Sequence, residues 1–206
     1  MEYDGILLLL DVDGGLHMKQ FVLGCIVLLV CSAVWAGVDF TNRGLFGYSN
    51  GVYVVDTVAY TASGYSLLWF NVAVPDTPEF IDFIDFPYPA SRLFADSEYV
   101  FVADGFGGLR IIDMLSFSEI GSVSTSGWAE DVFVSGDYAY VANGDQGVVV
   151  VDISDKTAPS VVENIPIDGW VRGVWYLDST VYVVGDTGLC VISVIAPDSL
   201  ELTSHI

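Results

Sequence analysis

Short apolar runs alternate with turns rich in Gly, Asp and Asn over most of the chain. In "DVFVS", Val132 and Val134 point to one face and Phe133 to the other, which is the period of two of a pleated strand. "GD" leads into a second strand, "YAYVA", and "NGDQG" is a hairpin turn before "VVVVDI", which is apolar on both faces and should be buried on both. With "SVVENIPI", this segment predicts four short antiparallel strands, and no stretch shows a sustained helical period.

The four-strand pattern repeats about every 40 residues. Ser91 to Asp113 matches Glu130 to Asp152 without a gap, Arg172 to Val194 is a further copy, and a more divergent copy begins near Arg43. Such units at this period are the signature of a β-propeller. The expected fold class is therefore all-β, a β-propeller of about four four-stranded antiparallel blades, either a closed four-bladed ring or an arc of a larger propeller. The expected blades are approximately residues 43–87, 88–127, 128–169 and 170–206.

The third copy, "GDYAYVANGDQGVVVVDISDKTAP", resembles the LVIVD repeat, a propeller-type repeat of exported and surface proteins. The resemblance runs from about Arg43 to the C-terminus and is weakest in the first copy. The fourth copy departs from it at Ser193, where Asp113 and Asp152 end the third strand of other copies. The resemblance implies a propeller architecture and an extracytoplasmic compartment. It implies no catalytic residue, because the family has no shared catalytic motif.

The N-terminal part has the pattern of an export signal. Lys19 precedes an apolar run that ends in small residues before Gly37, which predicts a signal peptide over 18–36 and repeats over 37–206. The expected location is secreted, periplasmic or on the cell surface. An uncleaved membrane anchor is the alternative, although the apolar run is shorter than the ~20 residues of a helical span. The acidic stretch 1–17 is a poor start for a signal and is interpreted as a mis-called upstream extension.

Composition narrows the classes of function. The chain is 53% apolar, and 27 Asp and Glu against six Lys and Arg give a formal charge of −21, which argues against nucleic acid and anionic membranes as partners. After removal of the signal, Cys190 and His205 would be the only Cys and His. Ser-His-acid catalysis needs a well-placed imidazole, and zinc sites need several Cys or His residues. We therefore predict no catalytic and no metal-ligating residue, and a buried, inert Cys190.

Carboxylates are the abundant reactive groups, and most have a structural interpretation. Asp113 and Asp152 should accept backbone hydrogen bonds in the turn after the third strand. Acids in the hairpin turns could ligate Ca²⁺, but no turn has a full D-x-D-x-D-G loop, so no cofactor is predicted. An enzyme that uses carboxylates at the propeller mouth, with or without a metal, is the alternative function. A truncated fragment of a larger LVIVD-repeat surface protein is another.

The favoured function is a non-enzymatic binding scaffold for a protein or glycan, with self-association as a way to complete the propeller. Tyr88, Trp128 and Trp170 are predicted at equivalent positions near the mouth of the central channel, where aromatic faces suit a sugar or peptide. The alternative is that these rings pack between blades. The remaining candidate residues come from the start of strand one and from the hairpin turns: Arg92, Glu130, Asp131, Arg172, Asp104, Asn143 and Asp186.

Overall fold

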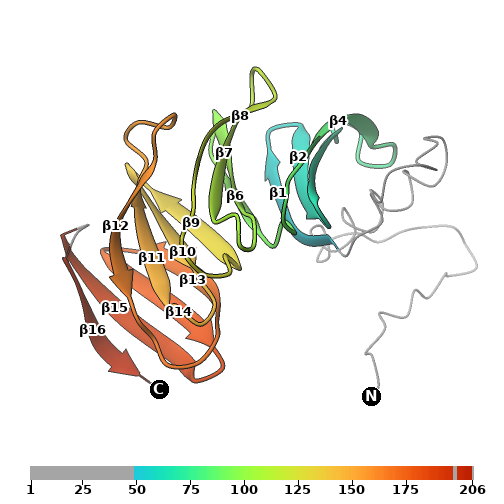
Figure 1. The fold of residues 1–206 in the computed structure, drawn as a ribbon. Helices are drawn as coiled ribbons and strands as arrows, with labels where there is room; N and C mark the ends of the chain where they lie inside the picture. Colours follow the sequence, from blue (N-terminus) through green and yellow to red (C-terminus); the bar gives the residue numbers. More distant parts are fainter. Residues whose placement is uncertain (1–48, 197–198, 206) are drawn as a thin grey trace, which may run out of the picture.

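The computed structural model describes residues 49–196 and 199–205, with side chains described up to residue 194. The expected extension 1–17 and signal 18–36 lie outside the described residues. The described part forms four antiparallel sheets of four strands and contains no helix (Figure 1). The prediction of an all-β propeller architecture with about four four-stranded blades is confirmed.

Within each sheet the strands lie in chain order, each hydrogen-bonded to the next. The first sheet contains β1 (Ser49–Val55), β2 (Val58–Ser63), β3 (Ser66–Asn71) and β4 (Glu79–Asp85). The second contains β5 (Leu93–Ala95), β6 (Tyr99–Ala103), β7 (Leu109–Asp113) and β8 (Ser118–Val123). The third contains β9 (Asp131–Ser135), β10 (Tyr138–Ala142), β11 (Val148–Asp152) and β12 (Ser160–Ile165). The fourth contains β13 (Val171–Leu177), β14 (Thr180–Gly185), β15 (Gly188–Ala196) and β16 (Ser199–His205).

The four sheets follow one another along an open arc (Figure 1). Their first strands are innermost, and β1 contacts β5, β5 contacts β9, and β9 contacts β13. No strand of one sheet completes another, so the ring is not closed by hydrogen bonds between the described strands. Of the two predicted forms, the described chain adopts the arc.

The core lies between neighbouring sheets. Three clusters of buried apolar side chains fill the joints between the first and second, second and third, and third and fourth sheets. The third strand of the third sheet is buried on both faces, as its apolar run predicted: residues Val148–Val151 of β11 are at most 1% exposed. Because burying one such side chain contributes roughly 1.5–3 kcal/mol, these joints hold the arc together.

A β-bulge recurs at the same place in all four sheets. The register between the third and fourth strands shifts after Trp69, Ile111, Val150 and Val191. A bulge adds one residue to one strand and increases the local right-handed twist. Each repeat therefore twists its outer edge in the same way.

The recurring Asp after the third strand holds the following turn. Asp113 accepts the backbone N–H of Ser116 at 2.6 Å, and Asp152 accepts that of Ser154 at 2.8 Å. Hydrogen bonds from the Ser116 and Ser154 side chains and backbone lower the pKa of each carboxyl. The predicted structural role of both Asp residues is confirmed.

Candidate binding face beside the hairpin turns

Trp128 and Trp170 each lie against the hairpin turn of the preceding sheet. The residue after each Trp pairs with that turn: Ala129 donates its N–H to the Gly105 carbonyl and Val171 to the Gly144 carbonyl, both at 2.9 Å. A Cβ built on Gly105 would lie 3.3 Å from Cζ2 of Trp128, and one on Gly144 would lie 3.1 Å from Cζ2 of Trp170. The turn glycines therefore make room for the indole rings.

Both Trp residues are half-buried, so each ring is partly packed and partly exposed. One face packs in the joint between sheets, and the Trp170 indole N–H donates to the Glu130 carboxylate at 2.8 Å. That bond spans the start of the third and fourth sheets, and it uses a carboxylate that was expected at the mouth. Glu130 therefore has a structural role, as the hydrogen-bond acceptor of the Trp170 indole.

The expected equivalence of Tyr88 is wrong by one residue. Ala90 donates its N–H to the Gly64 carbonyl at 2.7 Å, which is the bond that Ala129 makes in the next copy. Pro89 therefore occupies the position of Trp128, because backbone pairing and not aromatic character sets the correspondence. Tyr88 stands one residue earlier, and its ring is exposed.

Tyr88 belongs instead to a cluster of three rings, which we call the aromatic cluster. It consists of Tyr88, Phe106 from the β6–β7 turn, and Trp128. The Phe106 ring meets Trp128 edge-on with centroids 4.9 Å apart, and Tyr88 meets Phe106 edge-on at 6.1 Å. Phe106 is 59% exposed, so the cluster presents apolar surface to solvent.

Sequence reasoning missed Phe106. It lies in "GFGG", the Gly-rich hairpin turn of the second copy, and the next copy has Asp145 at the same place. The available signal was an aromatic residue among the three glycines of this turn, because glycine has no side chain against which the ring could pack.

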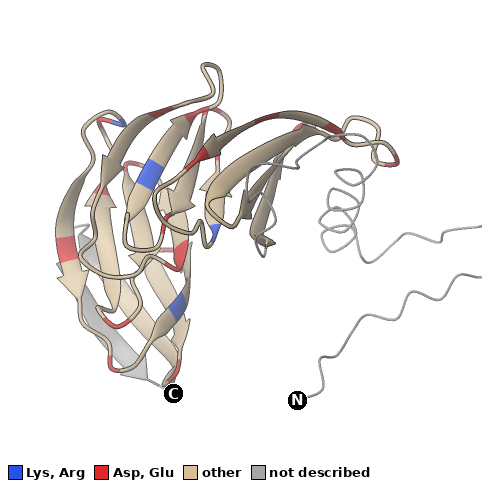
Figure 2. Cartoon of the chain, turned by 45° about the vertical axis from the view of Figure 1, so that its right-hand side comes forward, with Lys and Arg blue, Asp and Glu red and all other residues tan. Residues whose placement is uncertain are grey.

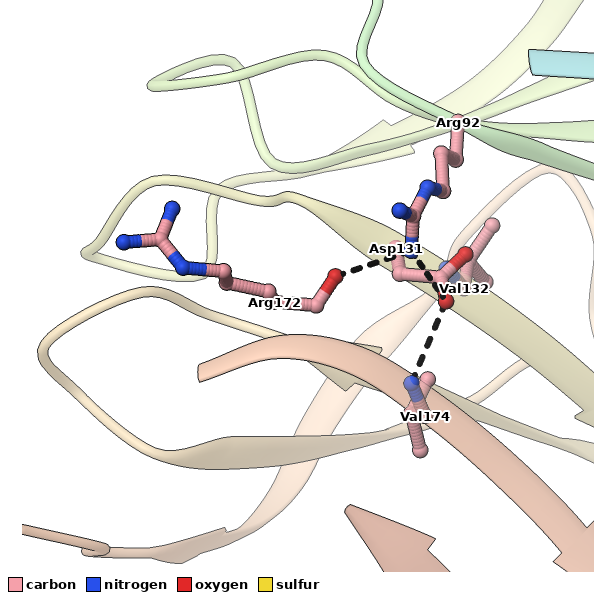
Figure 3. A network of polar contacts seen from close by, with 5 residues as sticks. All are labelled: Arg92, Asp131, Val132, Arg172 and Val174. Carbon is pink, nitrogen blue, oxygen red and sulfur yellow. Dashed lines mark hydrogen bonds and ion pairs between the residues drawn. The ribbon is translucent and has the colours of Figure 1, made fainter. Parts of the chain in front are cut away.

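A polar network joins the innermost strands of three sheets (Figure 3). Nη1 of Arg92 donates to Oδ2 of Asp131 at 3.3 Å and to the Arg172 carbonyl at 3.0 Å. Oδ2 of Asp131 also accepts the Val174 N–H at 3.1 Å, and Oδ1 accepts the Val132 N–H at 3.0 Å. We call this set the inner network. Arg92 lies just before β5, so one guanidinium ties the second, third and fourth sheets together.

The position of Asp131 in the inner network changes the pKa of its carboxyl. Burial raises its pKa above the ordinary value, and the Val174 N–H and the Arg92 charge oppose that rise. Half of the Arg92 side chain remains exposed, at 49%, beside a largely covered Asp131. The exposed Arg92 guanidinium is therefore held in one orientation by Asp131.

The three candidate residues of the hairpin turns, Asp104, Asn143 and Asp186, differ in solvent exposure. Asp104 and Asn143 are fully buried and have no surface to offer a ligand. Asn143 donates to the Thr125 carbonyl at 2.7 Å and accepts the Thr125 hydroxyl at 2.6 Å, so it holds its turn to the preceding connection. Asp186 is exposed and pairs with Arg172 at 2.9 Å. Only Asp186 stands where a ligand could reach it.

Asp104 is the buried half of an ion pair. It accepts Nε of Arg110 at 2.5 Å, and Arg110 also binds Glu119 at 2.9 Å. Burial raises the pKa of Asp104 to about 6, against the lowering effect of Arg110. The Asp104 carboxyl therefore has a structural role, because it links the β6–β7 turn to Arg110 of β7.

A family model for the LVIVD repeat matches residues 90–125 and 126–166. These two segments of the chain are LVIVD repeats. The matched ranges contain the second and third sheets, with Phe106, Trp128 and the start of the inner network. The resemblance inferred from the sequence is thus confirmed over these two copies.

The chain also resembles solved structures in fold. The crystal structure of the computationally designed Ika4 protein matches 71% of this chain and 91% of its own, with a TM-score of 0.62 and 10% identity. The computationally designed Ika8 protein matches 77% of this chain and 49% of its own, with a TM-score of 0.62 and 11% identity. The LVIVD-repeat chain therefore spans about half of Ika8. No curated protein matches it significantly.

The described residues contain neither a cluster of metal-ligating side chains nor a helix that could cross a membrane. Within 49–196 and 199–205, no group of three or more His, Cys, Asp or Glu residues is arranged to hold a metal ion. Over the same ranges, no helix has the length and hydropathy needed to cross a bilayer. Cys190 is buried and unbridged, and burial raises the pKa of its thiol.

Proposed function

We propose that this chain is an exported, non-enzymatic scaffold that binds a protein or glycan on the side of its arc that carries the turns between second and third strands. The proposed binding face combines the aromatic cluster with the exposed charges of Arg92, Arg172 and Asp186. The observation that carries this proposal is the exposure of Phe106 between two further rings, in a turn where folding needs no aromatic side chain.

The chemistry of this face suits a sugar or a peptide. Aromatic rings offer flat apolar area at low conformational cost, and their edges and faces accept C–H groups of a sugar or side chains of a peptide. Arg92 and Arg172 are half-exposed while each is anchored to a carboxylate, so their positions are fixed before a ligand arrives. Preorganised groups lose less entropy on binding.

The charge distribution favours a ligand that is not strongly anionic. Acidic residues are spread over the strands and turns of the sheets, while the basic residues are few and separate (Figure 2). Each Arg in the described range pairs with a carboxylate, and Lys156 donates to the Ile153 carbonyl at 2.7 Å. A neutral glycan or a neutral to basic peptide meets least repulsion on such a surface.

The test is binding of the purified chain to a glycan array and to a peptide library, with Phe106→Ala and Tyr88→Ala as variants. Both variants should lose most binding while keeping the unfolding midpoint, because exposed side chains contribute little to stability. Leu115→Ala is the matched control, since Leu115 is an exposed apolar residue in the β7–β8 connection of the same sheet. Binding that is unchanged in both aromatic variants would refute this face.

A further inference from the structure

Two asparagines of this chain, Asn50 and Asn143, are followed directly by glycine. Such a pair is chemically labile, because glycine has no side chain to keep its backbone nitrogen away from the amide carbon of the preceding Asn. The other Asn residues of the described range, Asn71 and Asn164, precede β-branched residues that crowd this approach. Since the two labile pairs have the same sequence, a difference in their reactivity must come from the fold.

The fold encloses Asn143. Its side chain is 0% exposed, and its amide donates to the Thr125 carbonyl at 2.7 Å and accepts the Thr125 hydroxyl at 2.6 Å. The backbone is held as well, because the Asn143 N–H donates to the Gly147 carbonyl at 2.8 Å. The side-chain amide cannot turn toward Gly144 without losing both of its buried hydrogen bonds.

Asn50 lies in a different environment. Its side chain is exposed and forms no hydrogen bond with the other described residues. Between β1 and β2, Ser49 pairs with Ser63 and Gly51 with Ala62, so Asn50 is the extra residue of a β-bulge. An extra residue has no cross-strand partner to hold its backbone extended. The Gly51 nitrogen can therefore reach Cγ of Asn50 without disrupting a hydrogen bond of that side chain.

We propose that Asn50 undergoes spontaneous deamidation and isomerisation in the folded chain, whereas the fold protects Asn143. The backbone nitrogen of Gly51 attacks Cγ of Asn50, loses its proton and closes a cyclic succinimide, while the side-chain nitrogen leaves as ammonia. Water then opens the ring at either of its carbonyls and gives aspartate or isoaspartate. Solvent supplies the water, and no atom is oxidised or reduced.

The products alter the joint between the first and second sheets. Isoaspartate carries the main chain through the former side chain, which lengthens the backbone of β1 by one methylene. A Cβ built on Gly51 would lie 3.0 Å from Cα of Arg92, and Tyr53 contacts Phe94 of β5 with ring centroids 5.3 Å apart, so β1 has little room to shift. Both products also add a negative charge to a chain of formal charge −21. We therefore expect the modified chain to unfold at a lower urea concentration.

Peptide mass spectrometry of the purified chain, incubated in warm and mildly alkaline buffer, tests the proposal. Asn50 should convert to the acid at least about tenfold faster than Asn143, because reaction at Asn143 first requires the loss of two buried hydrogen bonds. Unfolding the chain in urea should remove this difference, since both residues then precede an unhindered glycine. Equal rates in the folded chain, or an Asn50 that stays intact while the unfolded chain reacts, would overturn the proposal.

Urea denaturation of the incubated chain tests the effect on the joint. The midpoint of the parent chain should fall as Asn50 converts, whereas the matched control Asn50→Gln, which keeps an amide but cyclises less readily, should keep its midpoint. Freshly prepared Asn50→Asp adds the charge without the longer backbone, so it should lose less stability than the converted parent chain. An unchanged midpoint after conversion, or an equal loss in Asn50→Asp, would refute the role of the longer backbone. None of these measurements depends on ligand binding, so their outcome is separate from that of the proposed function.

Discussion

At the scale of single residues, equivalent positions of successive repeats can differ in side-chain charge. Asp104 and Asn143 occupy the same place after the second strand, and both are fully buried. Asn143 satisfies its neighbours as a neutral amide, whereas Asp104 brings a charge that needs Arg110 beside it. A buried ion pair costs desolvation energy that its attraction only partly repays.

Asp104→Asn should change how stability depends on pH. The native pKa of Asp104 is about 6, above the value of about 3.9 in an unfolded chain, so between these values the native state binds more protons. Its contribution to the free energy of unfolding therefore rises as pH falls from 7 toward 4, by at most about 3 kcal/mol. The difference in stability between the parent chain and the variant should shift toward the parent chain over that window, as urea denaturation at several pH values can measure.

Asp113→Asn is the control for this prediction, because hydrogen bonds from Ser116 lower the pKa of Asp113. A lowered native pKa has the opposite sign: the stability it contributes is lost as pH falls through the acid range. If the two variants show the same pH dependence relative to the parent chain, the assignment to Asp104 is wrong.

At the scale of elements, the strands could be predicted well from the sequence because several independent local signals in each repeat indicate the same strands. Period-two alternation, the Gly turns and the Asp after the third strand all agree in the copy that contains β9 to β12. Agreement across several local signals is what makes a fold predictable. The alignment of Tyr88 failed because the β4–β5 connection carries two prolines, and the pairing of Ala90 with Gly64 sets its register.

Glycines in the hairpin turns should differ in their tolerance of a side chain. Gly136 and Gly147 both have positive φ, +58° and +87°, but a Cβ on Gly136 meets nothing within 4 Å, whereas one on Gly147 would fall 2.1 Å from the Ile165 carbonyl oxygen. Gly136→Ala should cost about 1–2 kcal/mol for the left-handed backbone alone. Gly147→Ala should cost clearly more, because the connection after β12 must move.

Urea denaturation of the two glycine variants measures the difference. Gly136→Ala serves as the matched control, since it introduces the same side chain at a positive φ in the same sheet. Equal losses in the free energy of unfolding would mean that the contact with Ile165 relaxes without cost, and that backbone conformation alone selects glycine here.

At the scale of the whole molecule, the sequence could not predict how far the arc closes. Strand patterns report which face of a sheet is apolar, but curvature depends on how side chains of neighbouring sheets fit. Arg92 shows this plainly: it reaches the Arg172 carbonyl across 80 residues of chain, and no local pattern links the two positions. The aromatic cluster was missed for a related reason, because Phe106 and Trp128 meet across two sheets.

Export should remove the residues before Gly37 from the whole chain. Lys19, the apolar run and the small residues at its end have the order of a signal peptide, and its peptidase requires a small side chain just before the cut, here Ala36. Mass spectrometry of the exported chain should find an N-terminus near Gly37. Ala36→Trp should accumulate the uncleaved chain, whereas Val38→Ala, just beyond the cut, should be processed normally. An intact N-terminus at Met18 in a membrane fraction of the parent chain would instead establish an anchor, and the scaffold would then act while tethered to the membrane.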